Sequence, residues 1–250
     1  MKNTIQLIKL FFLFSLSITF AQNSQRYRVH VDNVIPSKVN DYEVLAKKLA
    51  DLAAENKEEK GWNMFVTDDH KYHAISPLNS MSELSLNPYA NTLEKMGGDA
   101  FIKIFEKFDE CYPSHGDYLL NLITTLSHMP VGMTNLIDGK DYRVNYLYYY
   151  EPKHSDKILE LAESFKKLYE SKGSKLHYRV YLSGFGNSES YLLVSFASEN
   201  AEDYKKLVEN SNKLLGEERI KLNDELEKYT FKIETRRGNM RRDLSYIPNK

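Results

Sequence analysis

Hydrophobic and polar positions follow two alternating periods along this chain, and the same succession of periods occurs twice. The first pass opens with an alternating segment, Arg26–Asn33. It predicts a strand, because successive side chains of a strand point to opposite faces. A helix is predicted next, beginning near Pro36 and ending before Gly61. Its apolar stripe has steps of 3, 4 and 3 and consists of Tyr42, Leu45, Leu49 and Leu52.

The rest of the first pass predicts a hairpin, a broken helical region and a closing strand. Residues 62–67 and 71–76 are predicted to form a hairpin around Asp68-Asp69. Helical spacing runs from about Tyr89 past Phe108. Pro113 and Gly116 interrupt it, and we expect helix again over 118–123. The closing strand is predicted at 126–130.

The second pass repeats this order. It predicts a strand at 142–150, a helix over 155–171, a hairpin of 176–182 with 191–196, and helix over 201–210 and again from 217. Residues 229–235 alternate as a strand does, but they also continue the helical spacing of Leu222 and Leu226. The matching segment of the first pass contains Pro113 and Gly116, which suit a strand poorly. We therefore favour helix over 229–235 and a closing strand at 244–248.

Matched residues indicate that the two passes are copies of one unit, with two unrelated domains as the alternative. Tyr27-Arg28-Val29 matches Tyr142-Arg143-Val144 at an offset of 115, whereas Pro36 and the helix after it match at an offset of 116. From Gly98 to Pro130 the offset is 118 without a gap. These matches predict a first repeat at 26–130, a linker at 131–140 and a second repeat at 141–248.

The order strand, helix, two strands, helix, strand is that of the ferredoxin-like unit, an antiparallel sheet with both helices on one face. In this order, in the Tyr-Arg-Val strand starts and in the Leu-Ser-(His/Tyr)-x-Pro ends, the chain resembles the dimeric α/β barrel superfamily. The resemblance implies an α+β fold in which the antiparallel sheets of two ferredoxin-like repeats pack together as a pseudo-dimeric barrel. It also implies a monomer, because the fusion supplies the barrel partner. The superfamily contains haem-degrading and quinone-forming monooxygenases and small-molecule isomerases, and fold alone does not choose among them.

The N-terminus has the features of a secretory signal. Lys2 and Lys9 precede an apolar run, and Thr19-Phe20-Ala21 is an acceptable cleavage site. We expect residues 1–21 to be a signal peptide and the protein to be secreted or periplasmic, without stable membrane insertion after cleavage. An uncleaved anchor is the alternative. No cysteine follows the run, so a lipoprotein is not expected.

The charge balance and the cysteine content exclude two further features. Cleavage after Ala21 leaves 32 Lys and Arg against 35 Asp and Glu. This balance argues against nucleic acid as a partner. The single cysteine, Cys111, cannot form an internal disulfide.

Strand parity suggests one polar site. Tyr27, Val29 and their matches should face the helices, so the opposite faces should line the space between the two sheets. Those faces carry the candidate ligand-binding residues, which suit a small anionic or polar ligand because arginine offers a rigid fork of donors: Arg28, His30, Arg143, Asn145, His177 and Arg179. A satisfied polar core or an exposed sheet face is the alternative.

Other chemistry is not indicated. His70 and His73 point to opposite faces of an extended strand, so no metal site is predicted there. The chain contains no dinucleotide fingerprint, nucleophile elbow or zinc-protease motif. We therefore expect no cofactor.

Three functions remain open, and the sequence does not name an activity. The first, which the absence of catalytic motifs favours, is non-enzymatic binding of a small polar or anionic ligand or of a protein partner. The second is a cofactor-poor or haem-related enzyme, of monooxygenase or isomerase type, with its site between the sheets. The third is a protein whose inter-sheet space is filled and whose function lies at its surface.

Overall fold

The computed structural model describes residues 24–129 and 136–248. Each repeat contributes four strands with helices between them. The first consists of β1 (Ser24–Asn33), α2 (Val39–Glu55), β2 (Asn63–Thr67), β3 (Lys71–Leu78), α3 (Ala90–Met96), α4 (Gly98–Asp109) and β4 (His115–Ile123). The second consists of β5 (Tyr142–Tyr150), α5 (Ser155–Ser171), β6 (Tyr178–Ser183), β7 (Tyr191–Ser198), α6 (Ala201–Lys228) and β8 (Thr230–Met240).

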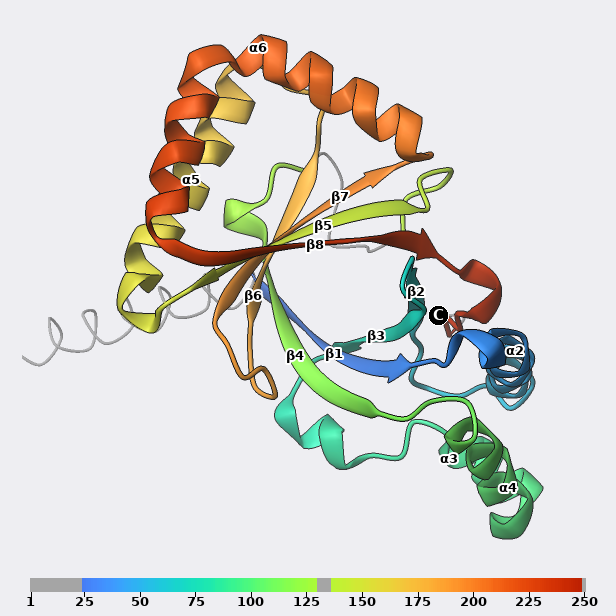
Figure 1. Cartoon of the computed structure of the whole chain (residues 1–250). Helices are drawn as coiled ribbons and strands as arrows, with labels where there is room; N and C mark the ends of the chain where they lie inside the picture. The colour runs from blue at the N-terminus through green and yellow to red at the C-terminus, as the bar shows by residue number, and fades with distance from the viewer. Residues whose placement is uncertain (1–23, 130–135, 249–250) are drawn as a thin grey trace, which may run out of the picture.

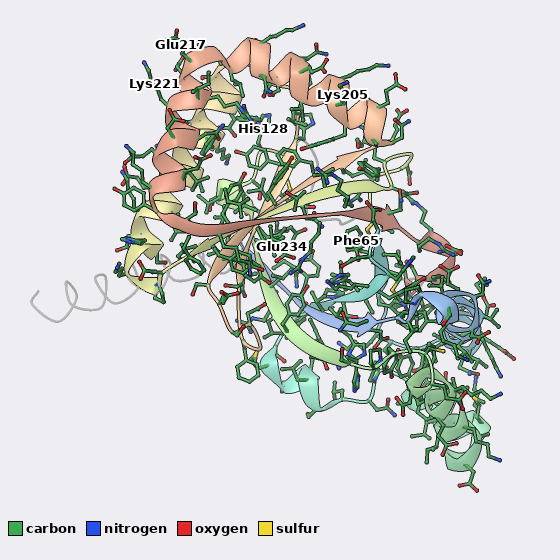
Figure 2. All side chains as sticks on the ribbon, viewed as in Figure 1. Phe65, His128, Lys205, Glu217, Lys221 and Glu234 are labelled. Carbon is green, nitrogen blue, oxygen red and sulfur yellow. The ribbon has the colours of Figure 1, made fainter. Side chains whose placement is uncertain are left out.

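The eight strands form one closed antiparallel barrel. Their order is β4-β1-β3-β2 in the first repeat and β8-β5-β7-β6 in the second. The two halves join where β2 pairs with β8, with Phe65 opposite Met240, and where β4 pairs with β6. Figure 2 shows Phe65 on β2 beside the end of β8. The α+β class and the pseudo-dimeric ferredoxin-like barrel expected from the sequence are confirmed.

Helices cover the outside of the barrel in two groups. Figure 1 shows α5 and α6 against the second repeat and α2, α3 and α4 against the first, with the strands between. α6 bends at Gly216, whose φ of 56° is not helical. No helix within the described residues is both long enough and apolar enough to cross a membrane.

Apolar side chains from both faces of the sheet are buried in three clusters. One fills the barrel interior and includes Val29, Leu122 and Leu147, none more than 1% exposed. The other two lie between the outer faces of the strands and the helices, one in each repeat.

The fourth strand of each repeat is where the sequence prediction was wrong. Residues 118–123 are not helix but belong to β4, and residues 230–235 belong to β8. Helix α6 ends at Lys228, before the alternating segment. Gly116 lies within β4, opposite Val31, while Pro113 precedes the strand and costs no sheet hydrogen bond.

The predicted closing strands are not strands of the barrel. The segments after β4 and β8 each begin with a 3-10 turn, at Thr124–Leu126 and Arg242–Leu244. Each then forms a single bridge, His128 with Tyr178 and Tyr246 with Trp62. Pro130 and residues 131–135 of the predicted linker lie outside the described residues, as does the predicted signal peptide, 1–21.

A second correction concerns the parity of β1. Tyr27 and Val29 face the barrel interior, not the helices, and Arg28 and His30 face outward. In β5 the inward residues are Arg143, Asn145, Leu147 and Tyr149. The strands thus match at the offset of 116 that Pro36 and the helix indicate. The Tyr-Arg-Val match is one residue out of register, and a one-residue shift exchanges the two faces of a strand.

Candidate functional site

A large cavity lies under the helices of the first repeat, between them and the outer face of its sheet. Its volume is about 620 Å³. Aromatic and aliphatic side chains form most of its wall, among them Trp62, Tyr89, Phe101, Phe105 and Phe108. We call it the first-repeat cavity.

One end of this cavity is charged. Asp117 Oδ1 lies 2.7 Å from Nε of Arg28 and 3.2 Å from Nδ1 of His30. The other ring nitrogen of His30, Nε2, lies 3.1 Å from Oδ1 of Asp32. Tyr42 donates a hydrogen bond of 2.7 Å to Oδ2 of Asp32. His115 brings a second imidazole, with its ring centre 5.4 Å from that of His30.

We call these five residues, Arg28, His30, Asp32, His115 and Asp117, the His30 cluster. Strand alternation explains how it forms. Arg28, His30 and Asp32 occupy every second position of β1, so they share its outer face. Asp117 of β4 is directly opposite His30, and His115 is directly opposite Asp32. The cluster contains imidazole nitrogens and carboxylate oxygens, the atoms that divalent metals take as ligands.

Electrostatics within the cluster favour the charged forms of His30 and Asp117. Burial by itself lowers the pKa of His30, but its hydrogen bonds to Asp117 and Asp32 outweigh burial and raise that pKa to about 9. Burial opposes ionisation of Asp117 as well, yet His30 and Arg28 hold the pKa of this carboxyl well below its usual range. When nothing else is bound at the cluster, His30 is therefore an imidazolium at neutral pH.

The second repeat has a smaller cavity in the equivalent place, of about 280 Å³. At the offset of 116, Tyr146 and Tyr148 stand where the first repeat has His30 and Asp32. Tyr204 donates to the hydroxyl of Tyr146 at 3.3 Å. This second-repeat cavity thus has the same location as the first but none of its charged cluster.

The barrel interior, where the sequence placed the site, is nearly filled. It leaves a space of only about 60 Å³. Three of the predicted ligand-binding residues do line it: Arg143, Asn145 and Arg179. Arg28 and His30 do not, for the reason of register given above. Figure 2 shows Glu234 on β8, where it accepts hydrogen bonds from Tyr149 and Arg236.

Arg179 is the least satisfied polar group of this interior. It is 6% exposed, and within the described part of the chain its Nε and Nη2 atoms have no hydrogen-bond partner. Burial and the charge of Arg179 lower the pKa of Arg143 to about 10. Arg143 also donates to the main-chain oxygens of Lys140 and Tyr142.

His177, the sixth predicted residue, lies elsewhere. It precedes β6 and stands beside His128, with 5.1 Å between the ring centres. It lines neither the interior nor the first-repeat cavity. The six predicted residues therefore divide among three places.

Sequence reasoning missed Asp32, Asp117, His115 and Tyr42. A signal existed for Asp32, because Arg28, His30 and Asp32 form one polar face of an alternating strand. No such signal existed for His115 and Asp117, because their segment was interpreted as a break followed by helix, and its pairing with β1 was not foreseen.

The fold is similar to those of several solved structures. An anthrone oxidase-like protein superposes with a TM-score of 0.59 at 13% identity, covering 88% of this chain and 93% of its own. A monooxygenase-like protein of Lactobacillus acidophilus gives 0.55 at 9% identity, with coverages of 90% and 97%. Another from Fusobacterium nucleatum gives 0.54 at 9% identity, with 86% and 92%.

No family model and no curated protein matches the sequence. At these identities the structural likeness concerns the fold, which is that of the dimeric α/β barrels in a single chain.

Proposed function

We propose that the protein is an enzyme acting on a small, largely aromatic molecule that carries an ionisable oxygen, and that the first-repeat cavity is its site. The observation that carries this proposal is the combination of a cavity with aromatic walls and a charged cluster at one end. A volume of about 620 Å³ lies within the range of roughly 300–1,000 Å³ typical of small-molecule sites.

The polar end suits an anionic oxygen. Arg28 and the His30 imidazolium place two positive charges there, and Asp117 now lies between them. Asp117 is 44% exposed, whereas Asp32 is 10% exposed and anchored by Tyr42. A phenolate or enolate oxygen can therefore replace the Asp117 carboxylate on both donors. Stabilising that negative charge lowers the barrier for loss of a proton from the bound molecule.

The names of the structural neighbours indicate which reaction to test first. One is anthrone oxidase-like and two are monooxygenase-like. Oxidation of the CH₂ group of an anthrone by dioxygen gives a carbonyl and water, and it needs no external reductant. This reaction begins with loss of a proton to leave an oxygen-stabilised anion, which is the charge the His30 cluster is suited to hold.

Binding can be tested through Trp62, the single tryptophan of the chain, which lines the cavity. We expect 1-naphthol and anthrone to change its fluorescence saturably. Ala46→Phe, which adds a ring inside the cavity, should abolish the change. Ala162→Phe is the matched control, because Ala162 is the equivalent residue of the second-repeat cavity. Equal binding by wild type and Ala46→Phe contradicts the proposed site.

Turnover is tested separately by dioxygen consumption with anthrone. We expect Arg28→Gln to lower the rate about 100- to 1,000-fold, as loss of one charge-stabilising donor does elsewhere. A wild-type rate no higher than that of Ala46→Phe removes the enzymatic proposal.

Non-enzymatic binding of the same class of ligand is the second candidate, and one observation favours it. Both ring nitrogens of His30 face carboxylate oxygens, so neither is available for proton transfer until Asp117 moves. Saturable binding without consumption of dioxygen supports this candidate over the first.

We also propose that the protein acts outside the cytoplasm as a monomer. Support comes from the signal-like N-terminus and from the closure of the barrel within one chain. N-terminal sequencing of the native protein should begin at Gln22, and sedimentation should give one copy. An N-terminus at Met1 contradicts export by cleavage, and an obligate dimer contradicts the monomer.

A further inference from the structure

Three side chains of the His30 cluster lie close enough to share one ion. One potential ligand atom each from His30, Asp32 and His115 lies within 4.8 Å of the other two. His30 Nε2 and Asp32 Oδ1 are already 3.1 Å apart. Two ligands of one metal ion are separated by about this distance when each lies roughly 2.0–2.2 Å from it.

The backbone brings these ligands together firmly. His30 and Asp32 are two positions apart on β1 and share its outer face. His115 opens β4 directly opposite Asp32, and directly opposite residues of antiparallel strands have Cβ atoms roughly 4.5–5.5 Å apart. The His115 ring stacks on Tyr112, with 5.3 Å between centres.

Neighbouring residues orient two of the three ligands from behind. Asp117 accepts from Nδ1 of His30, which leaves Nε2 directed toward Asp32 and away from Asp117. Tyr42 donates to Oδ2 of Asp32, which leaves Oδ1 on the side of His30. A histidine bonded to a carboxylate through its second nitrogen, and a ligating carboxylate that is itself hydrogen-bonded, are the usual surroundings of protein metal ions.

We propose that His30, Asp32 and His115 bind one divalent first-row transition metal ion, with its remaining coordination positions directed into the first-repeat cavity. Two histidines and one carboxylate with open positions form a donor set that proteins use for zinc and non-haem iron. Asp32 and Asp117 place two carboxylates beside this donor set, against one guanidinium from Arg28, so carboxylate charge is available to balance that of a divalent ion.

The second repeat provides an internal contrast. The positions equivalent to His30, Asp32 and His115 are Tyr146, Tyr148 and Ile233, at offsets of 116, 116 and 118. These side chains offer no matching donor set. One ion per chain is therefore expected. The site stands on its own side chains and does not depend on which organic molecule enters the cavity.

The test is titration of chelator-treated protein with Co²⁺ and Zn²⁺ alone. We expect one Co²⁺ per chain with visible absorption from nitrogen and oxygen ligation, and displacement of Co²⁺ by Zn²⁺. His115→Gln should weaken binding about 100-fold or more, because it removes a ligand. Asp117→Asn should weaken it about 10- to 100-fold, because it removes the group that orients His30.

His177→Gln is the matched control, because it removes one imidazole of the other histidine pair, His128 and His177. Its Co²⁺ affinity should equal that of wild type. His115 is exposed, so circular dichroism and thermal unfolding of His115→Gln should match wild type.

Binding of Co²⁺ by His115→Gln with unchanged affinity and spectrum overturns the proposal, as does a wild type that binds no ion. Binding lost equally in His177→Gln and His115→Gln also overturns it, because this points to nonspecific histidine binding. Binding of 1-naphthol to the metal-free protein, followed through Trp62, is measured independently. Failure of the metal site and failure of the proposed function are therefore distinguishable.

Discussion

Asp117 lies directly opposite His30 in the pairing of β4 with β1, and its Oδ1 atom is 3.2 Å from Nδ1 of His30. This contact, with that of Asp32, raises the pKa of His30 against the effect of burial. In chelator-treated protein, a titration of the imidazole signals by NMR should give His30 a pKa of about 9. Asp117→Asn should move that pKa down toward the ordinary value of about 6.5.

Asp109→Asn is the control for this titration, because Asp109 lines the same cavity but accepts from Tyr112 and does not contact His30. If Asp117→Asn leaves the His30 pKa near 9, the contact is not its cause. The pKa is higher in the folded than in the unfolded chain. The contribution of protonated His30 to the free energy of unfolding is therefore complete below about pH 6.5 and is lost as pH rises through about 9. The loss is on the order of 1–2 kcal/mol after screening by solvent.

His73 should make the folded state less stable in acid, in contrast to His30. Burial first, and then Arg236 and Lys71, lower the pKa of His73 to about 3. The unfolded chain therefore takes up a proton near pH 6.5 that the folded chain does not. Stability falls as pH drops from about 6.5 toward 3. His73→Phe should reduce this loss by on the order of 2 kcal/mol. Urea unfolding at pH values from 7 to 4 measures the free energy of unfolding of both proteins. If that free energy falls equally with pH in wild type and His73→Phe, the prediction is contradicted.

Gly238 is essential to the junction of β8 with β2. A Cβ atom on Gly238 would lie 1.9 Å from the main-chain oxygen of Val66. Because that neighbour is backbone, it cannot move aside. Gly238→Ala should therefore destabilise the fold by about 3 kcal/mol or more, measured by urea unfolding. Gly116→Ala in β4 is the control, since a Cβ there meets nothing within 4 Å, and it should change stability little.

Arg179 gives a prediction about the barrel interior. It is buried, and two of its nitrogens lack partners within the described chain. Replacement of an unsatisfied buried charge by an apolar side chain of similar length is often stabilising. Arg179→Met should raise the free energy of unfolding by about 1–3 kcal/mol. If it lowers stability instead, and wild-type stability rises with phosphate or chloride, an anion occupies this interior.

The sequence predicted the elements that local pattern determines. The two passes, the first helices and the hairpins follow from alternation, helical spacing and internal matches, whereas the barrel was implied by the resemblance to the dimeric α/β barrels. The fourth strands did not, because residues 229–235 fit both periods and the choice depends on pairing with β5, far away in the chain. Residues 230–235 form a strand because they pair with β5.

Arg28 and His30 were assigned to the wrong face of β1 for a related reason. The inner face of β1 is buried in the barrel and the outer face is half-buried under helices, so polarity alone does not say which face is which. The Tyr-Arg-Val match suggested one register and Pro36 the other. The residues of the His30 cluster were partly identified, but His115 and Asp117 are more than eighty positions from His30, and only the β1–β4 pairing brings them to it.

The junction between β2 and β8 also constrains how the chain reaches its native state. Residues 65–67 must wait for residues 238–240, the end of the last strand, before the barrel can close. During synthesis, which starts at the N-terminus, the interior face of the first four strands therefore stays exposed until the chain is nearly complete. Such long-range closure slows folding and leaves an open sheet edge available to other chains. Truncation before β8 should give an aggregating product, however well the first repeat resembles an independent domain.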